Sequence, residues 1–189
     1  MINAVSQKIL KILIRNNAVR KEQESLVLFG IEQGLHLLIN VFIMIMTGFL
    51  LGRLWQSIIM LISFMSVRRY AGGYHADTRM QCAVMSWIVF FITITVQKYV
   101  FINFMAEVTI LAVTLLILYC FCPVQNHNKL LADREIKKYR FTAFRNFLIC
   151  ICVFVLGIII KNKDISVSIV LGMAMVDVII LLDKVKFKR

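Results

Sequence analysis

The chain has 189 residues, 60% of them hydrophobic, and a formal net charge of +12. In an ordinary soluble domain about half of the residues are apolar, so this excess argues against a soluble globular protein and indicates an integral membrane protein. The basic residues lie in short segments between apolar runs and form no single basic face. We therefore expect one membrane domain over residues 1–189 and no nucleic-acid partner.

The first part of the chain predicts helices that lie on the membrane surface. In residues 2–15, apolar side chains recur on one side of a helix, and Lys8, Lys11 and Arg15 recur on another. Such a helix suits the interface beside the anionic lipids of the inner leaflet. Residues 21–33 predict a second short helix. We accordingly expect interfacial helices in residues 1–33, a transmembrane bundle in 34–182 and a basic cytoplasmic tail in 183–189.

Six apolar runs predict an all-α polytopic membrane protein with about six transmembrane helices. The runs are residues 35–51, 54–67, 83–96, 101–122, 147–160 and 165–182. Several are shorter than the ~20 residues of a perpendicular span. The second run is the shortest. It fits either a span that borrows Arg53 and Arg68 from its flanks or a re-entrant segment.

The distribution of Lys and Arg predicts the orientation in the membrane. Only four of the 22, namely Arg53, Lys98, Lys161 and Lys163, fall in the connections after the first, third and fifth runs. The other 18 precede the first run, follow the sixth, or lie in the two remaining connections. The positive-inside rule then places both termini, and the connection after the second run, on the cytoplasmic side of a cell membrane.

That connection contains a histidine and a cysteine seven positions apart, His75 and Cys82. On one continuous helix the spacing corresponds to a rise of about 10 Å, too far for a direct hydrogen bond. His75 must therefore lie on a loop that folds back if it is to act on Cys82. Gly72 and Gly73 supply the backbone freedom for such a loop.

The residues just before Cys82 predict the start of a helix. Thr78 and Gln81 form a capping box, which places Cys82 about one turn into the new helix. The positive end of the helix dipole and the nearby Arg79 favour a thiolate there. A nucleophile activated in this way, with a base on the preceding loop, is the layout of a cysteine hydrolase or acyl transferase.

Several acidic residues are candidates for supporting roles. Glu32, Asp77 and Asp177 could each orient His75, and the sequence does not choose among them. Asp177 is also a candidate ion-pair partner for Arg68 or Arg69. Together with Glu107, it is an ionisable residue inside an apolar run, where such residues usually have a function.

The remaining cysteines form two Cys-x-Cys pairs near the predicted cytoplasmic ends of the fourth and fifth spans. They are Cys120, Cys122, Cys150 and Cys152. Alternate helix positions point to different faces, so we expect neither a metal site nor a cofactor. In the cytoplasm we expect no structural disulfide either.

The segment Arg68-Arg69-Tyr70-Ala71-Gly72-Gly73-Tyr74-His75-Ala76, followed by Cys82, resembles the accessory gene regulator protein B (AgrB) family. The chain length, amphipathic start, apolar runs and basic fourth connection resemble it as well. Members are membrane cysteine endopeptidases of Gram-positive quorum sensing. The resemblance implies an AgrD-like precursor peptide with an amphipathic leader, a signal segment and an acidic tail, and it implies a homodimer.

The resemblance also implies roles for individual residues. Cys82 would attack the carbonyl between signal segment and tail, with His75 as base and then acid. The resulting thioester would pass to a nucleophile of the signal segment and close a thiolactone or lactone ring. Arg68, Arg69 and Arg79 suit an acidic tail electrostatically, although positive-inside anchoring explains them equally well.

Two other classes of function remain as alternatives. A small membrane transporter would need polar residues through several spans, and this chain has few. A non-catalytic membrane partner protein would not need Cys82.

Overall fold

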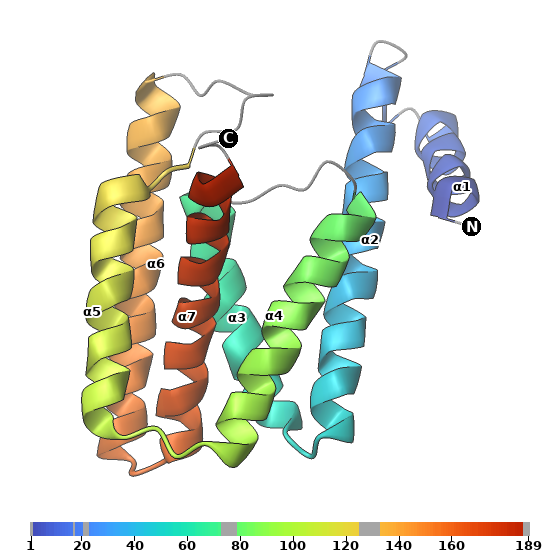
Figure 1. Ribbon diagram of the computed structural model, residues 1–189. Helices are drawn as coiled ribbons and strands as arrows, with labels where there is room; N and C mark the ends of the chain where they lie inside the picture. Colours follow the sequence, from blue (N-terminus) through green and yellow to red (C-terminus); the bar gives the residue numbers. More distant parts are fainter. Residues whose placement is uncertain (1, 17, 21–22, 73–78, 125–132, 187–189) are drawn as a thin grey trace.

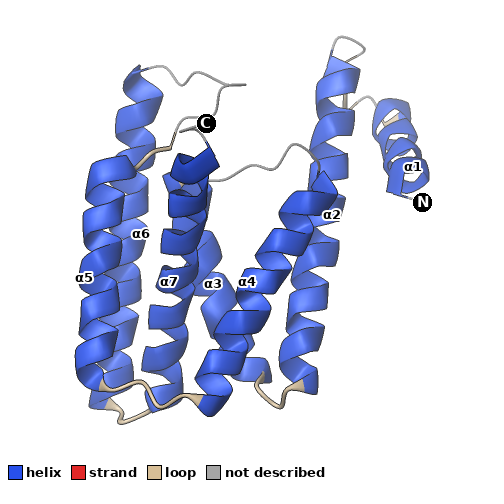
Figure 2. Ribbon diagram, viewed as in Figure 1, coloured by secondary structure: helices blue, strands red, loops and turns tan. Residues whose placement is uncertain are grey.

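The computed structural model is a bundle of long helices preceded by a short helix, and Figure 1 shows their arrangement. It describes residues 2–16, 18–20, 23–72, 79–124 and 133–186. Within these ranges all regular secondary structure is helical, as Figure 2 shows, so the predicted all-α fold is confirmed. The helices are α1 (Ile2–Arg15), α2 (Glu24–Leu50), α3 (Leu54–Ala71), α4 (Arg79–Tyr99), α5 (Phe104–Phe121), α6 (Asp133–Ile159) and α7 (Lys163–Lys186).

Five helices in the described part of the chain are long and apolar enough to cross a membrane: α2, α4, α5, α6 and α7. The helices exceed the shorter apolar runs because polar residues extend them. For example, α6 begins at Asp133, well before the apolar run 147–160. Residues 24–33, expected to belong to a separate interfacial helix, instead form the first turns of α2. That prediction was wrong because helical structure continues across the change from charged to apolar sequence.

Helix α3 is the one long helix in the described part of the chain that is not apolar enough to count among these five. It is one continuous helix of 18 residues, so the re-entrant alternative for the second run was wrong. It packs most extensively against α7 and also contacts α6 and α2. The buried Ser57 and Ser63 hydroxyls donate to carbonyl oxygens of their own helix, of Arg53 and Met60. These polar side chains are therefore satisfied without water.

A glycine allows α3 and α7 to approach closely. A Cβ atom added to Gly172 of α7 would collide with Ser63 Oγ and would lie 2.7 Å from Met60 O. Small residues at such a contact let two helix backbones pack tightly in a membrane. Fully buried side chains such as Val67 on α3 and Ile180 on α7 extend this contact toward the ends of both helices. The two helices thus form the scaffold on which Arg68 and Asp183 are placed.

The six long helices alternate in direction, so the bundle has two distinct ends (Figure 1). Short connections join α2 to α3, α4 to α5, and α6 to α7 at one end. There, Arg53 Nη1 lies 3.2 Å from Asp164 Oδ1, and Gln97 Nε2 donates to Ser168 Oγ over 2.7 Å. The opposite end holds the start of α4, which lies beside α2, and the last turns of α3, α5 and α7 (Figure 1).

Candidate functional site

Cys82 lies in the first turn of α4, as the capping pattern predicted. The helix begins at Arg79, which makes Cys82 its fourth residue, and the side chain is half-buried. Cys82, Met85, Ser86 and Val89 recur at the spacing of one helical face. All four line a small cavity between α4 and its neighbours α3 and α7.

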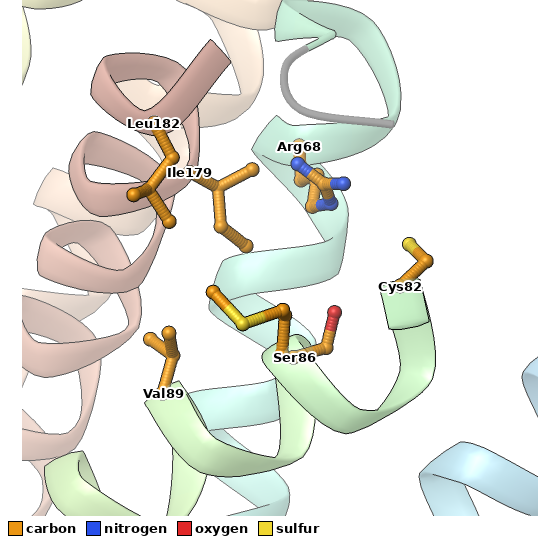
Figure 3. Close-up of a pocket in the computed structure, with 7 residues that line it drawn as sticks. Arg68, Cys82, Ser86, Val89, Ile179 and Leu182 are labelled. Atoms are coloured by element: carbon orange, nitrogen blue, oxygen red, sulfur yellow. The ribbon is translucent and has the colours of Figure 1, made fainter. Parts of the chain in front are cut away.

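The cavity beside Cys82 is completed by one residue of α3 and two of α7, and Figure 3 shows its walls. These residues are Arg68, Ile179 and Leu182. The volume is about 10 Å³, close to the minimum that holds a single water molecule. In Figure 3 the Arg68 guanidinium and the Ser86 hydroxyl both extend toward the space next to the Cys82 thiol. The cavity can therefore receive one small polar atom beside the sulfur.

The Arg68 guanidinium is held between α3 and α7. It lies 5.8 Å from the ring centroid of Phe64, one helical turn earlier. Its electrostatic neighbours are the Cys82 sulfur and the Asp183 carboxylate, and Asp183 is only 5% exposed. A buried carboxylate next to an arginine compensates a charge that is otherwise expensive to remove from water. Asp183 thus allows a positive charge to be kept beside the thiol, a role that the sequence did not reveal.

Asp177 makes a different contact from the one suggested by sequence. Thr114 Oγ1 of α5 lies 2.7 Å from Asp177 Oδ2, in the interior between α5 and α7. In the described part of the chain it forms no salt bridge with Arg68 or Arg69, so the predicted ion pair was wrong. Asp183 follows Asp177 by six residues, about 9 Å farther along the helix, where α7 meets the end of α3.

The end of α3 is fixed by a contact with the chain segment after α5. Val124 N–H donates to Ala71 O over 2.9 Å, and Gly72 N–H donates to Arg68 O over 3.1 Å. Gly72 has a φ of +76°, and a Cβ atom there would lie 2.6 Å from Val124 O. Both the backbone conformation and the close approach require glycine. The part of the chain that leads to His75 therefore leaves α3 from a defined point.

Comparison with protein families shows which family this chain belongs to. The family model for accessory gene regulator B matches residues 6–181, nearly the entire chain. The chain belongs to the AgrB family. No curated protein and no solved structure matches it. The AgrB family takes part in the processing of AgrD, so the cavity around Cys82 lies in a protein with a peptide-processing role.

The other residues singled out in this AgrB family member are distributed as follows. Arg69 is exposed, with its guanidinium 5.9 Å from the Tyr70 ring centroid. Glu32 is half-buried on α2. Gly73, His75, Asp77 and the side chain of Arg79 lie outside the described residues, so the contact of His75 with Cys82 and the choice of its orienting acid stay predictions.

Glu107 belongs to the end of the bundle opposite Cys82. It is buried in the first turn of α5, where Lys163 and Ser166 of α7 are its electrostatic and hydrogen-bonding neighbours. This arrangement connects two helices and places the carboxylate far from the AgrB cysteine. Glu107 therefore has a structural partner and no part in the site around Cys82.

The four remaining cysteines do not gather at one end of the bundle. Cys122 follows α5, whereas Cys150 and Cys152 lie in the second half of α6, because that helix starts earlier than its apolar run. Cys150 Sγ lies 3.6 Å from Ser66 Oγ. Among the described residues, no group of three or more His, Cys, Asp and Glu side chains could hold a metal ion.

Proposed function

We propose that this AgrB family protein is a membrane-embedded cysteine endopeptidase that removes the C-terminal tail of an AgrD-type precursor and promotes cyclisation of the signal segment. One observation carries the proposal. The Cys82 thiol is half-buried at the start of a helix, beside the Arg68 charge, and it follows the segment of residues 68–76 that resembles the AgrB family, within the part of the chain that the family model matches. A thiol in positive surroundings at a helix start is the environment of a reactive cysteine.

The first chemical step is acyl transfer to sulfur. The Cys82 thiolate attacks the carbonyl carbon between signal segment and tail, and the carbonyl π electrons move to its oxygen. When this intermediate collapses, the C–N bond breaks and the tail leaves as an amine that takes its proton from His75. The product is a thioester on Cys82.

The second step passes the acyl group to the substrate itself. A cysteine or serine of the signal segment attacks the thioester carbon, Cys82 leaves as thiolate, and a thiolactone or lactone ring closes. Exchange between two sulfurs is nearly neutral in energy, so little driving force is needed. A site enclosed by apolar residues such as Val89, Ile179 and Leu182 helps to exclude the water that otherwise hydrolyses the thioester.

Basic side chains around the Cys82 end of the bundle suit an acidic tail. Arg69 and the first half of α6 expose positive charge there, and this half of α6 includes Arg134, Lys137, Lys138 and Arg140. The same charges support a cytoplasmic position for the active site and both termini by the positive-inside rule. Anionic lipid of the inner leaflet is then the surface along which an amphipathic leader reaches the site. Homodimerisation, implied by the family resemblance, also stays a prediction.

The proposal is tested with a synthetic AgrD-type peptide that carries a fluorophore on its acidic tail and the protein in liposomes. Cys82→Ala and His75→Ala should each abolish tail release while the proteins still insert in the membrane. A matched control changes Cys120, Cys122, Cys150 and Cys152 to alanine together and should retain cleavage. Persistent cleavage by Cys82→Ala would remove the nucleophile from this proposal.

A second experiment distinguishes acyl transfer from simple hydrolysis. A peptide that lacks the internal cysteine or serine offers no acceptor for the acyl group. A covalent Cys82–peptide thioester should then accumulate, be visible in the intact mass and be released by neutral hydroxylamine. Rapid formation of a linear acid without an adduct would leave an endopeptidase and refute the cyclisation step.

A further inference from the structure

We propose that the Ser86 hydroxyl and the Arg68 guanidinium form the oxyanion site of the reaction at Cys82, with Ser86 as a catalytic residue. The inference rests on the proposed function and adds two hydrogen-bond donors to its catalytic site. Acyl transfer to a thiolate places negative charge on the former carbonyl oxygen. Donors fixed around that oxygen usually provide the largest part of the stabilisation of the transition state.

Ser86 is placed by the register of α4. It follows Cys82 by four residues, so the two side chains lie on the same face, one turn apart. Side chains on a helix lean toward its N-terminus, which directs Ser86 toward Cys82. Figure 3 shows its hydroxyl pointing to the space between the Arg68 guanidinium and the Cys82 thiol.

The Ser86 hydroxyl is available as a donor. Thr93 and Thr95, on the same helix, donate to the carbonyl oxygens four residues earlier, of Val89 and Phe91, over 2.6 and 2.7 Å. These bonds are the ordinary use of a hydroxyl in an apolar helix. Ser86 makes no hydrogen bond among the described residues and lines the cavity with Cys82. Its proton is thus free to meet an oxygen of the substrate.

Arg68 supplies a second donor from the opposite wall. Its guanidinium carries five N–H groups, so it can interact with Asp183 and still donate to an oxygen in the cavity. Its positive charge stabilises the negative charge that develops on the oxyanion. Asp183 is a positioning residue in this arrangement, because it acts on the substrate only through Arg68.

The size of the cavity agrees with this use. A volume of about 10 Å³ is too small for a peptide side chain but receives one oxygen atom. Met85, Val89, Ile179 and Leu182 make the rest of the wall apolar. Hydrogen bonds to the oxyanion are stronger in such surroundings because the local dielectric constant is low.

The test compares Ser86→Ala with the unchanged protein in liposomes, using the tail-labelled AgrD-type peptide. Removing a donor to the oxyanion should lower kcat on the order of 10²-fold and leave KM unchanged. Ser86→Thr, which keeps a hydroxyl, should recover most of the rate. The matched control is Thr95→Ala, since that hydroxyl lies on the same helix and bonds backward to Phe91 O.

Alkylation of Cys82 by iodoacetamide separates a catalytic from a structural effect. This reagent reacts at a saturated carbon and develops no oxyanion, so Ser86→Ala should be alkylated at the rate of the unchanged protein. Full kcat in Ser86→Ala, or slower alkylation in proportion to slower cleavage, would overturn the assignment while Cys82-dependent cleavage stands. Absence of Cys82-dependent cleavage in the unchanged protein would instead overturn the proposed function.

Discussion

Replacing Gly72 with alanine should weaken the structure at the end of α3 by an amount that can be worked out. The residue has φ +76° and ψ −153°, a region used almost only by glycine, and forcing another residue into it costs about 1–3 kcal/mol. The new Cβ atom would also lie 2.6 Å from Val124 O. To relieve this clash, the backbone of Val124 must move away, which breaks the hydrogen bond from Val124 N–H to Ala71 O. Loss of that hydrogen bond costs about 1 kcal/mol. The total is about 2–4 kcal/mol.

Two other glycines separate the contributions. Gly52 also has a positive φ, +70°, but nothing lies within 4 Å of an added Cβ atom, so Gly52→Ala should show the backbone term alone, about 1–2 kcal/mol. Gly34 lies within α2 with open space around it, and Gly34→Ala should cause no loss, because alanine is the better helix former.

The measurement is reversible unfolding of the detergent-solubilised protein by sodium dodecyl sulfate, followed by the fluorescence of its two tryptophans, Trp55 and Trp87. The expected order of stability is Gly34→Ala, then Gly52→Ala, then Gly72→Ala. If Gly72→Ala loses no more stability than Gly52→Ala, the close contact between Gly72 and Val124 does not contribute to the free energy of unfolding, and the reasoning is refuted.

Three further predictions concern the ion pair, the packing of α3 and α7, and the topology. Asp183→Asn should lower kcat for tail release on the order of 10²-fold, because Arg68 loses the group that positions it. Asp183→Glu should recover part of the rate, and an unchanged rate in Asp183→Asn would contradict this prediction. Gly172→Leu should lower the midpoint of detergent unfolding, because its side chain enters the space of Ser63, and an unshifted midpoint would show that the helices are not in close contact. In a variant without native cysteines, a membrane-impermeant maleimide should label a cysteine at Lys98 but not one at Lys137 in intact cells, and labelling at Lys137 would refute the orientation.

Much of the architecture follows from local sequence signals. Long apolar runs and the distribution of Lys and Arg predicted a polytopic helical bundle, because the membrane imposes helices on any chain that crosses it. The start of α4 at Arg79 was predicted by the capping residues, and with it the position of Cys82 in the first turn. Gly72 was expected to matter for the loop, and its positive φ agrees. Ser86 could also have been found, since its spacing of four from Cys82 depends on helix geometry alone.

Other features depend on which helices are neighbours, and the sequence does not contain that information in local form. Asp177 and Asp183 are both acidic residues near the end of the same apolar run, yet one faces Thr114 of α5 and the other faces Arg68 of α3. Successive residues of a helix are about 100° apart around its axis, so positions 177 and 183 point to different sides of α7. The close contact of Gly172 with α3 fixes how α7 is turned in the bundle. The sequence by itself therefore determined the membrane fold, the helix start and the candidate nucleophile. Only the tertiary structure decided which charges and hydroxyls surround that nucleophile, because packing between distant helices sets which face of each helix is turned inward.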